Sequence, residues 1–241
     1  MDLKDVLNFR RSVRVYEAAA IAPLVVKRCI ELATLAPNSS NMQLWEAYHI
    51  TSPHLIQQMA KACLGQSSVS TASQLVVFVT RQDLHRRRAK ANIAFEKENI
   101  RRNSPVERQE KRINDRLLYY GKLMPFLYGR FFGILGLIRK VGVSVVGLFR
   151  PIVYQVSEND IRIVVHKSCA LAAQTFMTAM ANERYDTCPL EGFDSKRVKK
   201  LLQLPYGAEI NMVVSCGIRK GDEGIWGDRF RVPFEEVYHS L

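Results

Sequence analysis

The segment Gln74–Thr80 restricts the fold of this chain more than any other, because it reads Gln-Leu-Val-Val-Phe-Val-Thr. Its five central residues are all apolar, and β-branched and aromatic side chains of this kind favour strands. No polar residue alternates with them, so the strand is predicted to lie in the middle of a sheet with both faces covered. Two other stretches, Trp45–Thr51 and Ile210–Cys216, are also predicted to form strands.

Helices are expected around these strands. Apolar residues at helical spacing predict a short amphipathic helix at Met1–Leu7, a second from Pro23 to Leu35 and a third over His54–Leu64. The alanine-rich stretch Ile161–Tyr185 predicts a long helix whose small side chains permit close packing. A last helix is expected to be capped by Asp194 or Ser195 and to end before Leu204-Pro205, with loops at Asp186–Phe193 and from Gly217 onward.

Composition limits the class of protein. The chain has 241 residues, of which 47% are hydrophobic, enough for an ordinary globular core. Its five cysteines have no C-x-x-C spacing, so neither a disulfide framework nor a metal site is expected. The first residues lack the apolar run of a secretory signal, so a cytoplasmic protein with reduced thiols is expected. The net charge of +12 favours anionic partners, which could be nucleic acid, a phospholipid surface or phosphate-bearing small molecules.

A long, unusual segment interrupts the pattern between residues 84 and 155. Its first part, within Arg81–Arg116, holds twelve basic and six acidic residues and predicts two solvated helices broken near Ser104-Pro105. The second part, Leu123–Val153, is apolar but interrupted by basic residues, so no uncharged run within it reaches the length of about 20 residues that a membrane-spanning helix needs. It is expected either to fold over a ligand pocket as a lid or to lie on a membrane surface, and burial as a lid is the favoured reading.

Two short basic clusters lie near the two ends of the chain. The first contains Arg10, Ser12 and Arg14, which share one side of an extended backbone; the second contains Arg229 and Arg231. Guanidinium groups bind phosphate oxygens in bidentate fashion, and a serine hydroxyl can add a contact. Together these residues could form an anion clamp.

Three polar turns lie between the clusters. Residues 36–45 read Ala-Pro-Asn-Ser-Ser-Asn-Met-Gln-Leu-Trp, and their amides offer donor and acceptor together, which suits the edge of a heterocycle. Residues 187–194 read Thr-Cys-Pro-Leu-Glu-Gly-Phe-Asp, a composition that fixes backbone in an unusual path. Residues 65–69 form a weaker polar turn. Each of these turns alone could equally be an ordinary loop.

In this order and spacing, the stretches resemble the nitroreductase family of flavin-dependent oxidoreductases. The resemblance rests on R-R-S-x-R, A-P-x-S-x-N-x-Q-x-W, C-P-x-E-G-F-D and the C-terminal basic pair before proline, and it spans almost the whole chain. It implies one α+β domain over residues 1–241, with a central, mainly antiparallel sheet flanked by helices and an insertion at about 84–155 that covers the substrate pocket. It also implies an intertwined homodimer.

The resemblance implies FMN as cofactor and suggests which residues bind it. Arg10, Ser12, Arg229 and Arg231 would hold the phosphate and ribityl end, Arg11 would contribute through its backbone, and Arg14 would approach the pyrimidine ring. Pro189, Glu191 and Gly192 would line the flavin, with a backbone amide near Glu191 reaching N5. Gln66 and Ser68 would add polar contacts, and Pro37, Asn38, Ser39 and Asn41 would contact the cofactor of the other subunit.

The implied reaction moves hydride from NADH or NADPH through flavin N5 to a nitroaromatic, quinone or similar acceptor by a ping-pong mechanism. No protein acid or base is expected to be catalytic, since the cofactor carries out the redox chemistry. A flavoprotein with another reduction, such as reductive dehalogenation, remains an alternative. The other alternative is a nucleic-acid or membrane-surface protein that uses the basic Arg81–Arg116 face, but the chain has no recognisable nucleic-acid-binding motif.

Overall fold

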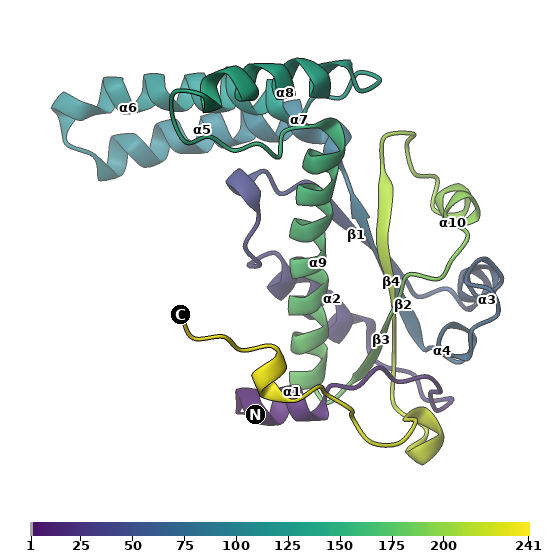
Figure 1. Ribbon diagram of the computed structural model, residues 1–241. Helices are drawn as coiled ribbons and strands as arrows, with labels where there is room; N and C mark the ends of the chain where they lie inside the picture. The colour runs from purple at the N-terminus through teal and green to yellow at the C-terminus, as the bar shows by residue number, and fades with distance from the viewer. Residues whose placement is uncertain (1) are drawn as a thin grey trace.

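The centre of the computed structural model, which describes residues 2–241, is a four-stranded antiparallel sheet (Figure 1). Its strands run in the order β1-β2-β4-β3: β1 Trp45–Ile50, β2 Gln74–Thr80, β4 Glu209–Gly217 and β3 Asp186–Leu190. Every residue of β2 is buried, as its unbroken apolar sequence predicts. The predicted α+β class with an antiparallel sheet is therefore confirmed.

Helices cover both faces of the sheet, and the alternation of side chains along β2 decides what each face contacts (Figure 1). Val76 and Phe78 pack against α2 and α9, whereas Leu75, Val77 and Val79 pack on the opposite face. The helices of the two layers are α2 Pro23–Ala33 and α9 Glu158–Asn182 on the first face, and α3 Pro53–Ala62, α4 Ser67–Ser70 and α10 Ser195–Leu201 on the second.

The long helix α9 extends along the whole of the sheet layer (Figure 1). It begins three residues before the predicted start because Ser157 and Asp160 form a capping box, in which each side chain accepts a hydrogen bond from the other residue's backbone amide. The fully buried Ala172 and Ala173 bring the α9 backbone close to the core. Asp194 caps α10, as predicted.

One secondary-structure prediction was wrong. Asp186–Phe193 was expected to be a loop, but Asp186–Leu190 pairs with β4 as strand β3. Pro189 and Asp186 disfavour a strand by propensity, yet β3 lies at the edge of the sheet, where a missing backbone donor is tolerated. The first predicted helix is α1, Leu3–Phe9; Met1 lies outside the described residues.

The insertion contains four helices that project from one end of the sheet (Figure 1). They are α5 His85–Asn103, α6 Val106–Leu118, α7 Met124–Tyr128 and α8 Ile134–Gly147, with a π-helical turn before α7. The predicted break near Ser104-Pro105 separates α5 from α6. The apolar stretch Leu123–Val153 was expected to be buried. Met124 and Tyr128 are buried, but α8 exposes most of its large apolar side chains. Among the helices of residues 2–241, none is long and apolar enough to cross a bilayer.

Candidate cofactor-binding site

The segment after α1 runs alongside the edge strand β3. The amide of Val13 donates to the carbonyl of Thr187 (3.2 Å), and the amide of Arg14 donates to the carbonyl of Gly224 (2.8 Å). This extended backbone buries Val13 completely and leaves Ser12 and Arg14 exposed on the opposite side. The alternation predicted for this cluster is confirmed, and it presents Ser12 and Arg14 beside the start of the 187–194 turn.

The two basic clusters meet, although more than 200 residues separate them. The guanidinium of Arg229 donates to the carbonyls of Leu7 (3.0 Å), Asn8 (3.1 Å) and Arg10. These are carbonyls at the C-terminal end of α1, which have no partner within the helix and which favour a nearby cation. Arg229 therefore anchors the end of α1 and the backbone of Arg10.

Four guanidinium groups are concentrated here. The pKa of Arg10 is lowered by burial and then by Arg231, with a smaller effect from Arg11. Burial and the neighbouring Arg10, Arg11 and Arg231 lower the pKa of Arg229 in the same way. Within residues 2–241 none of these four forms a salt bridge. A dianion such as a phosphate monoester would relieve this mutual repulsion, so the donor set fits the FMN phosphate.

A buried ion pair that the sequence analysis missed supports this cluster. Arg219 binds the carboxylate of Asp186 through its side chain and through its backbone amide (2.8 Å), and it also donates to the carbonyl of Phe9 (2.9 Å). Its guanidinium lies 4.4 Å from the centre of the Phe9 ring, and Arg184 lies 5.3 Å from the same ring. The pair fixes the end of α1 against β3. Because 33 residues separate its members, no local pattern could have revealed it.

The second and third polar turns also come together. The side-chain amide of Gln66 (Nε2) donates to the carbonyl of Gly192 (2.8 Å), which joins the start of α4 to the end of the 187–194 turn. Cys188, near the start of the 187–194 turn, has a buried thiol. Burial raises the pKa of this thiol, and Arg14, Ser68 and Arg10 partly offset that rise. Ser68, Arg10 and Arg14 therefore all lie near this thiol. Of the predicted site, this chain brings together the two basic clusters, the 65–69 turn and the 187–194 turn.

The remaining predicted turn, residues 36–45, is held elsewhere, and we call its central part, residues 38–43, the 38–43 turn. The amide of Ser39 donates to the Ser168 hydroxyl on α9 (3.2 Å), and Asn92 of α5 exchanges two hydrogen bonds with Asn41. Ser40 and Asn41 have φ values of 53° and 50°, a left-handed conformation that such polar residues tolerate. The insertion thus shapes this turn directly.

The turn and the arginine cluster lie toward opposite ends of α9. Figure 1 shows α1 at the lower end of the helix and the turn beside its upper half. From Ser168 to Asn182 the axial rise of an α-helix gives about 21 Å. In one chain, therefore, Pro37, Asn38, Ser39 and Asn41 are not brought to the other predicted site residues.

A further cavity lies at neither of these places. It has a volume of about 650 Å³ and opens where the insertion joins the sheet, among Gln82, Tyr128, Arg130, Lys199, Tyr206 and Glu209. Glu209 stands at the start of β4, so about 26 Å of strand separates it from Gly217 at the end near α1. The sequence analysis did not identify this cavity, because its lining comes from five separate segments.

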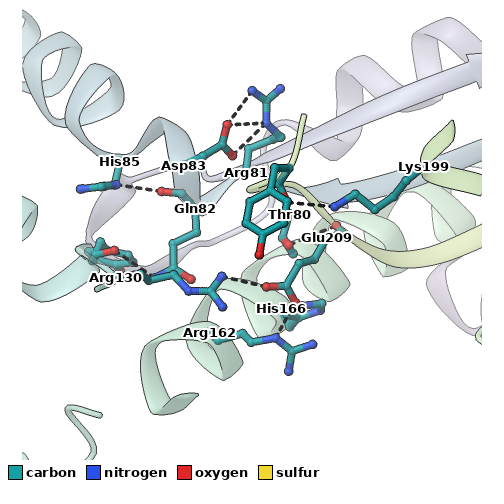
Figure 2. A network of polar contacts seen from close by, with 12 residues as sticks. Thr80, Arg81, Gln82, Asp83, His85, Arg130, Arg162, His166, Lys199 and Glu209 are labelled. Atoms are coloured by element: carbon teal, nitrogen blue, oxygen red, sulfur yellow. Dashed lines mark hydrogen bonds and ion pairs between the residues drawn. The ribbon is translucent and has the colours of Figure 1, made fainter. Parts of the chain in front are cut away.

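Figure 2 shows two arginines and a histidine around the Glu209 carboxylate. Arg130 donates to one oxygen (2.8 Å), while Arg162 and the Nε2 of His166 (3.3 Å) contact the other. The hydrogen bond from His166 and those from the two arginines hold the pKa of Glu209 far below its usual range. Glu209 is therefore ionised at neutral pH and joins the insertion, α9 and β4 rather than exchanging protons.

The fold and the site define a class: an antiparallel α+β protein with a cluster of arginines beside the edge strand of its sheet. The chain belongs to the nitroreductase family, whose model matches residues 7–218. It is also similar to protein DrgA of Synechocystis sp. (strain ATCC 27184 / PCC 6803 / Kazusa), with 26% identity over 92% of this chain and 86% of DrgA. The resemblance found in the sequence motifs is confirmed.

Solved structures agree on the fold. Protein ydfN of Bacillus subtilis has a TM-score of 0.74 and 20% identity, covering 100% of this chain and 99% of that chain. A protein of Exiguobacterium sibiricum 255-15, in complex with FMN, has a TM-score of 0.69 and 17% identity, covering 100% and 98%. Family membership supports a flavin-dependent oxidoreductase.

Proposed function

We propose that this protein binds FMN at the arginine cluster and uses it to reduce a small-molecule acceptor with NADH or NADPH. The observation that carries the proposal is the meeting of Arg10, Arg11, Arg229 and Arg231 without an acidic partner among residues 2–241. Such a cluster is costly unless an anion binds it. The FMN complex of the structurally similar E. sibiricum protein supports the choice of anion.

The residues around the cluster have distinct roles in this proposal. Arg10 and Arg231 bind the phosphate, and Ser12 adds its hydroxyl. Arg229 is a positioning residue, since its guanidinium is already bonded to three carbonyls of the α1 end. Arg11 donates to the carbonyl of Gly227 (2.7 Å), which ties the C-terminal segment to the cluster.

The flavin ring would lie over the 187–194 turn. When bound, FMN supplies the two-electron chemistry, accepting hydride at N5 and passing electrons on to the acceptor. Arg14, exposed beside this turn, would stabilise the negative charge of the reduced ring by preorganised electrostatics. Pro189, Glu191 and Gly192 would support the ring, and the hydrogen bond from Gln66 to Gly192 keeps that backbone in position.

A second subunit would complete each site. The 38–43 turn lies far along α9 from the arginine cluster of its own chain, so Pro37, Asn38, Ser39 and Asn41 would reach the FMN bound by the partner. The protein would then be a homodimer with two shared sites. NADH or NADPH and the acceptor, a nitroaromatic, quinone or similar compound, would use the same cleft in turn, which gives ping-pong kinetics.

Spectroscopy and kinetics test this proposal. The purified protein is expected to be yellow, with a flavin absorbance that bleaches anaerobically when NADH or NADPH is added. Initial-rate plots with a quinone or nitroaromatic acceptor are expected to give parallel lines. A colourless protein that takes up no FMN would contradict the cofactor assignment, and intersecting lines would contradict the shared cleft.

A further inference from the structure

Helix α8 of the insertion presents its apolar side chains to solvent. Ile134, Leu137, Ile138, Val141, Val145 and Leu148 recur at three- and four-residue spacing and form one stripe along the helix. Leu137 is 66% exposed and Leu148 is 80% exposed. The stripe ends in Phe132 and Phe149, which are 94% and 84% exposed. We call these eight residues the α8 stripe.

The inward side of α8 contains a buried arginine and two closely packed glycines, and their contacts fix the orientation of the helix. Arg139, the buried charged residue of α8, donates to the carbonyls of Phe126 (2.9 Å) and Leu127 at the end of α7. Gly136 lies so close to the amide of Glu158 that a Cβ would approach it to 2.7 Å, and Gly147 packs just as tightly against Tyr154. Turning α8 over would bury the stripe but break all of these contacts.

The charge around the stripe is strongly positive. Seventeen Lys and Arg and six Asp and Glu lie between residues 81 and 155, an excess of eleven, compared with +12 for the whole chain. Residues 117–157 contain five basic residues and no acidic one. Beside the start of α8 a groove of about 410 Å³ is lined by Lys140 and by Arg130 and Arg162, which are both paired with Glu209. Glu158, the acidic residue of that groove, accepts from the amide of Phe131 (2.9 Å).

We propose that the α8 stripe docks on an anionic phospholipid surface, with α8 lying in the plane of the interface. A helix with large apolar side chains on one face and cations beside it binds a membrane in this way, without crossing it. At 14 residues, α8 is too short to span a bilayer. Figure 1 places α8 at the outer edge of the projecting helices, away from the sheet, where a flat surface can reach it. The cations Lys140 and Arg150 are exposed and can reach the phosphate headgroups.

Vesicle flotation of the purified full chain tests this docking. The parent is expected to float with vesicles of phosphatidylcholine mixed with phosphatidylglycerol and to float much less with phosphatidylcholine alone. The triple variant Leu137→Gln, Val141→Gln, Leu148→Gln is expected to lose about tenfold or more of this binding, since apolar burial drives it. Glutamine is a good helix former and these positions are exposed, so the fold is expected to survive. The matched control is Val106→Gln, at an exposed apolar position on α6 of the same insertion, and it is expected to bind like the parent.

A fluorescence variant tests the same claim without removing the stripe. Tryptophan at Val141→Trp is expected to shift its emission to shorter wavelength when the mixed vesicles are added, whereas Val106→Trp is expected to stay unchanged. Equal flotation of parent and triple variant would overturn the proposal, because the basic charge alone would then explain the binding. A parent protein that does not bind vesicles would also overturn it. So would a parent protein that forms an oligomer which the triple substitution dissociates, since a second copy would then cover the stripe.

Discussion

The guanidinium of Arg229 donates a hydrogen bond to the carbonyl oxygen of Leu7 across 222 positions of sequence, at 3.0 Å. The contact joins the two ends of the chain. Arg229 caps the first helix, and Arg10, which follows this helix, lies in the arginine cluster proposed to bind phosphate. Figure 1 shows the C-terminal segment returning to α1. In the proposed anion clamp, Arg229 positions the backbone of α1, and Arg10 and Arg231 would bind the anion.

Single alanine variants separate these two tasks. Arg231→Ala removes an exposed cation, so FMN affinity is expected to fall about tenfold or more, while the free energy of unfolding stays within about 0.5 kcal/mol of the parent. Arg229→Ala is expected to lower FMN affinity and also to lower the unfolding free energy by about 1 kcal/mol, because α1 loses its cap. FMN titration followed by fluorescence measures the affinity, and urea unfolding measures the free energy of unfolding. Stoichiometric FMN in the double variant Arg229→Ala, Arg231→Ala would rule out the clamp.

The buried Asp186 carboxylate is expected to be worth more to stability than any exposed acid. Its side chain is 2% exposed and is bonded to Arg219, so Asp186→Asn is expected to lower the free energy of unfolding by about 3 kcal/mol. Asp222→Asn, in an exposed turn, is the matched control and is expected to change it by less than about 0.5 kcal/mol. Similar urea midpoints for the two variants would contradict the anchoring role given to Arg219.

Glu209 predicts a specific acid dependence of stability. Its pKa is far below the ordinary value of 4.5, so the folded state keeps it charged while the unfolded state takes up a proton. The stability it contributes is therefore complete above about pH 5 and decreases as the pH falls below about 4.5. Glu209→Gln is expected to be less stable than the parent by about 1–3 kcal/mol at pH 7, and this gap is expected to narrow with acid. A gap that stayed constant down to about pH 3 would be inconsistent with this network.

All five cysteines are buried, and this predicts inert thiols in the native protein. Burial raises the pKa of Cys29 and of Cys63 to about 11 and also raises that of the other three. Iodoacetamide is therefore expected to modify none of them quickly at pH 8, and all five after unfolding in urea. Rapid labelling of Cys188 in the folded protein would show that the site around Arg10 and Arg14 is open to solvent.

The sequence predicted those features that local pattern determines. The apolar run of β2 identifies a buried strand, and the alternation of Ser12, Val13 and Arg14 assigns their faces correctly. Sequence-based prediction was wrong where residues distant in the sequence determine the structure. Strand β3 was expected to be a loop, and it forms because its backbone pairs with β4. The same holds for α8, whose apolar sequence suggested burial, whereas Arg139 and Gly136 turn its apolar face outward.

Subunit complementation tests the shared site most directly. One variant carries Arg10→Ala and Arg231→Ala, the other carries Asn38→Ala and Asn41→Ala, and each alone is expected to bind FMN poorly. If each site combines the arginine cluster of one subunit with the 38–43 turn of its partner, the mixed dimer has one intact site. The account predicts that purified mixed dimers recover half of the parental FMN content and activity. Mixed dimers that bind as little FMN as dimers of either variant alone would contradict the shared site.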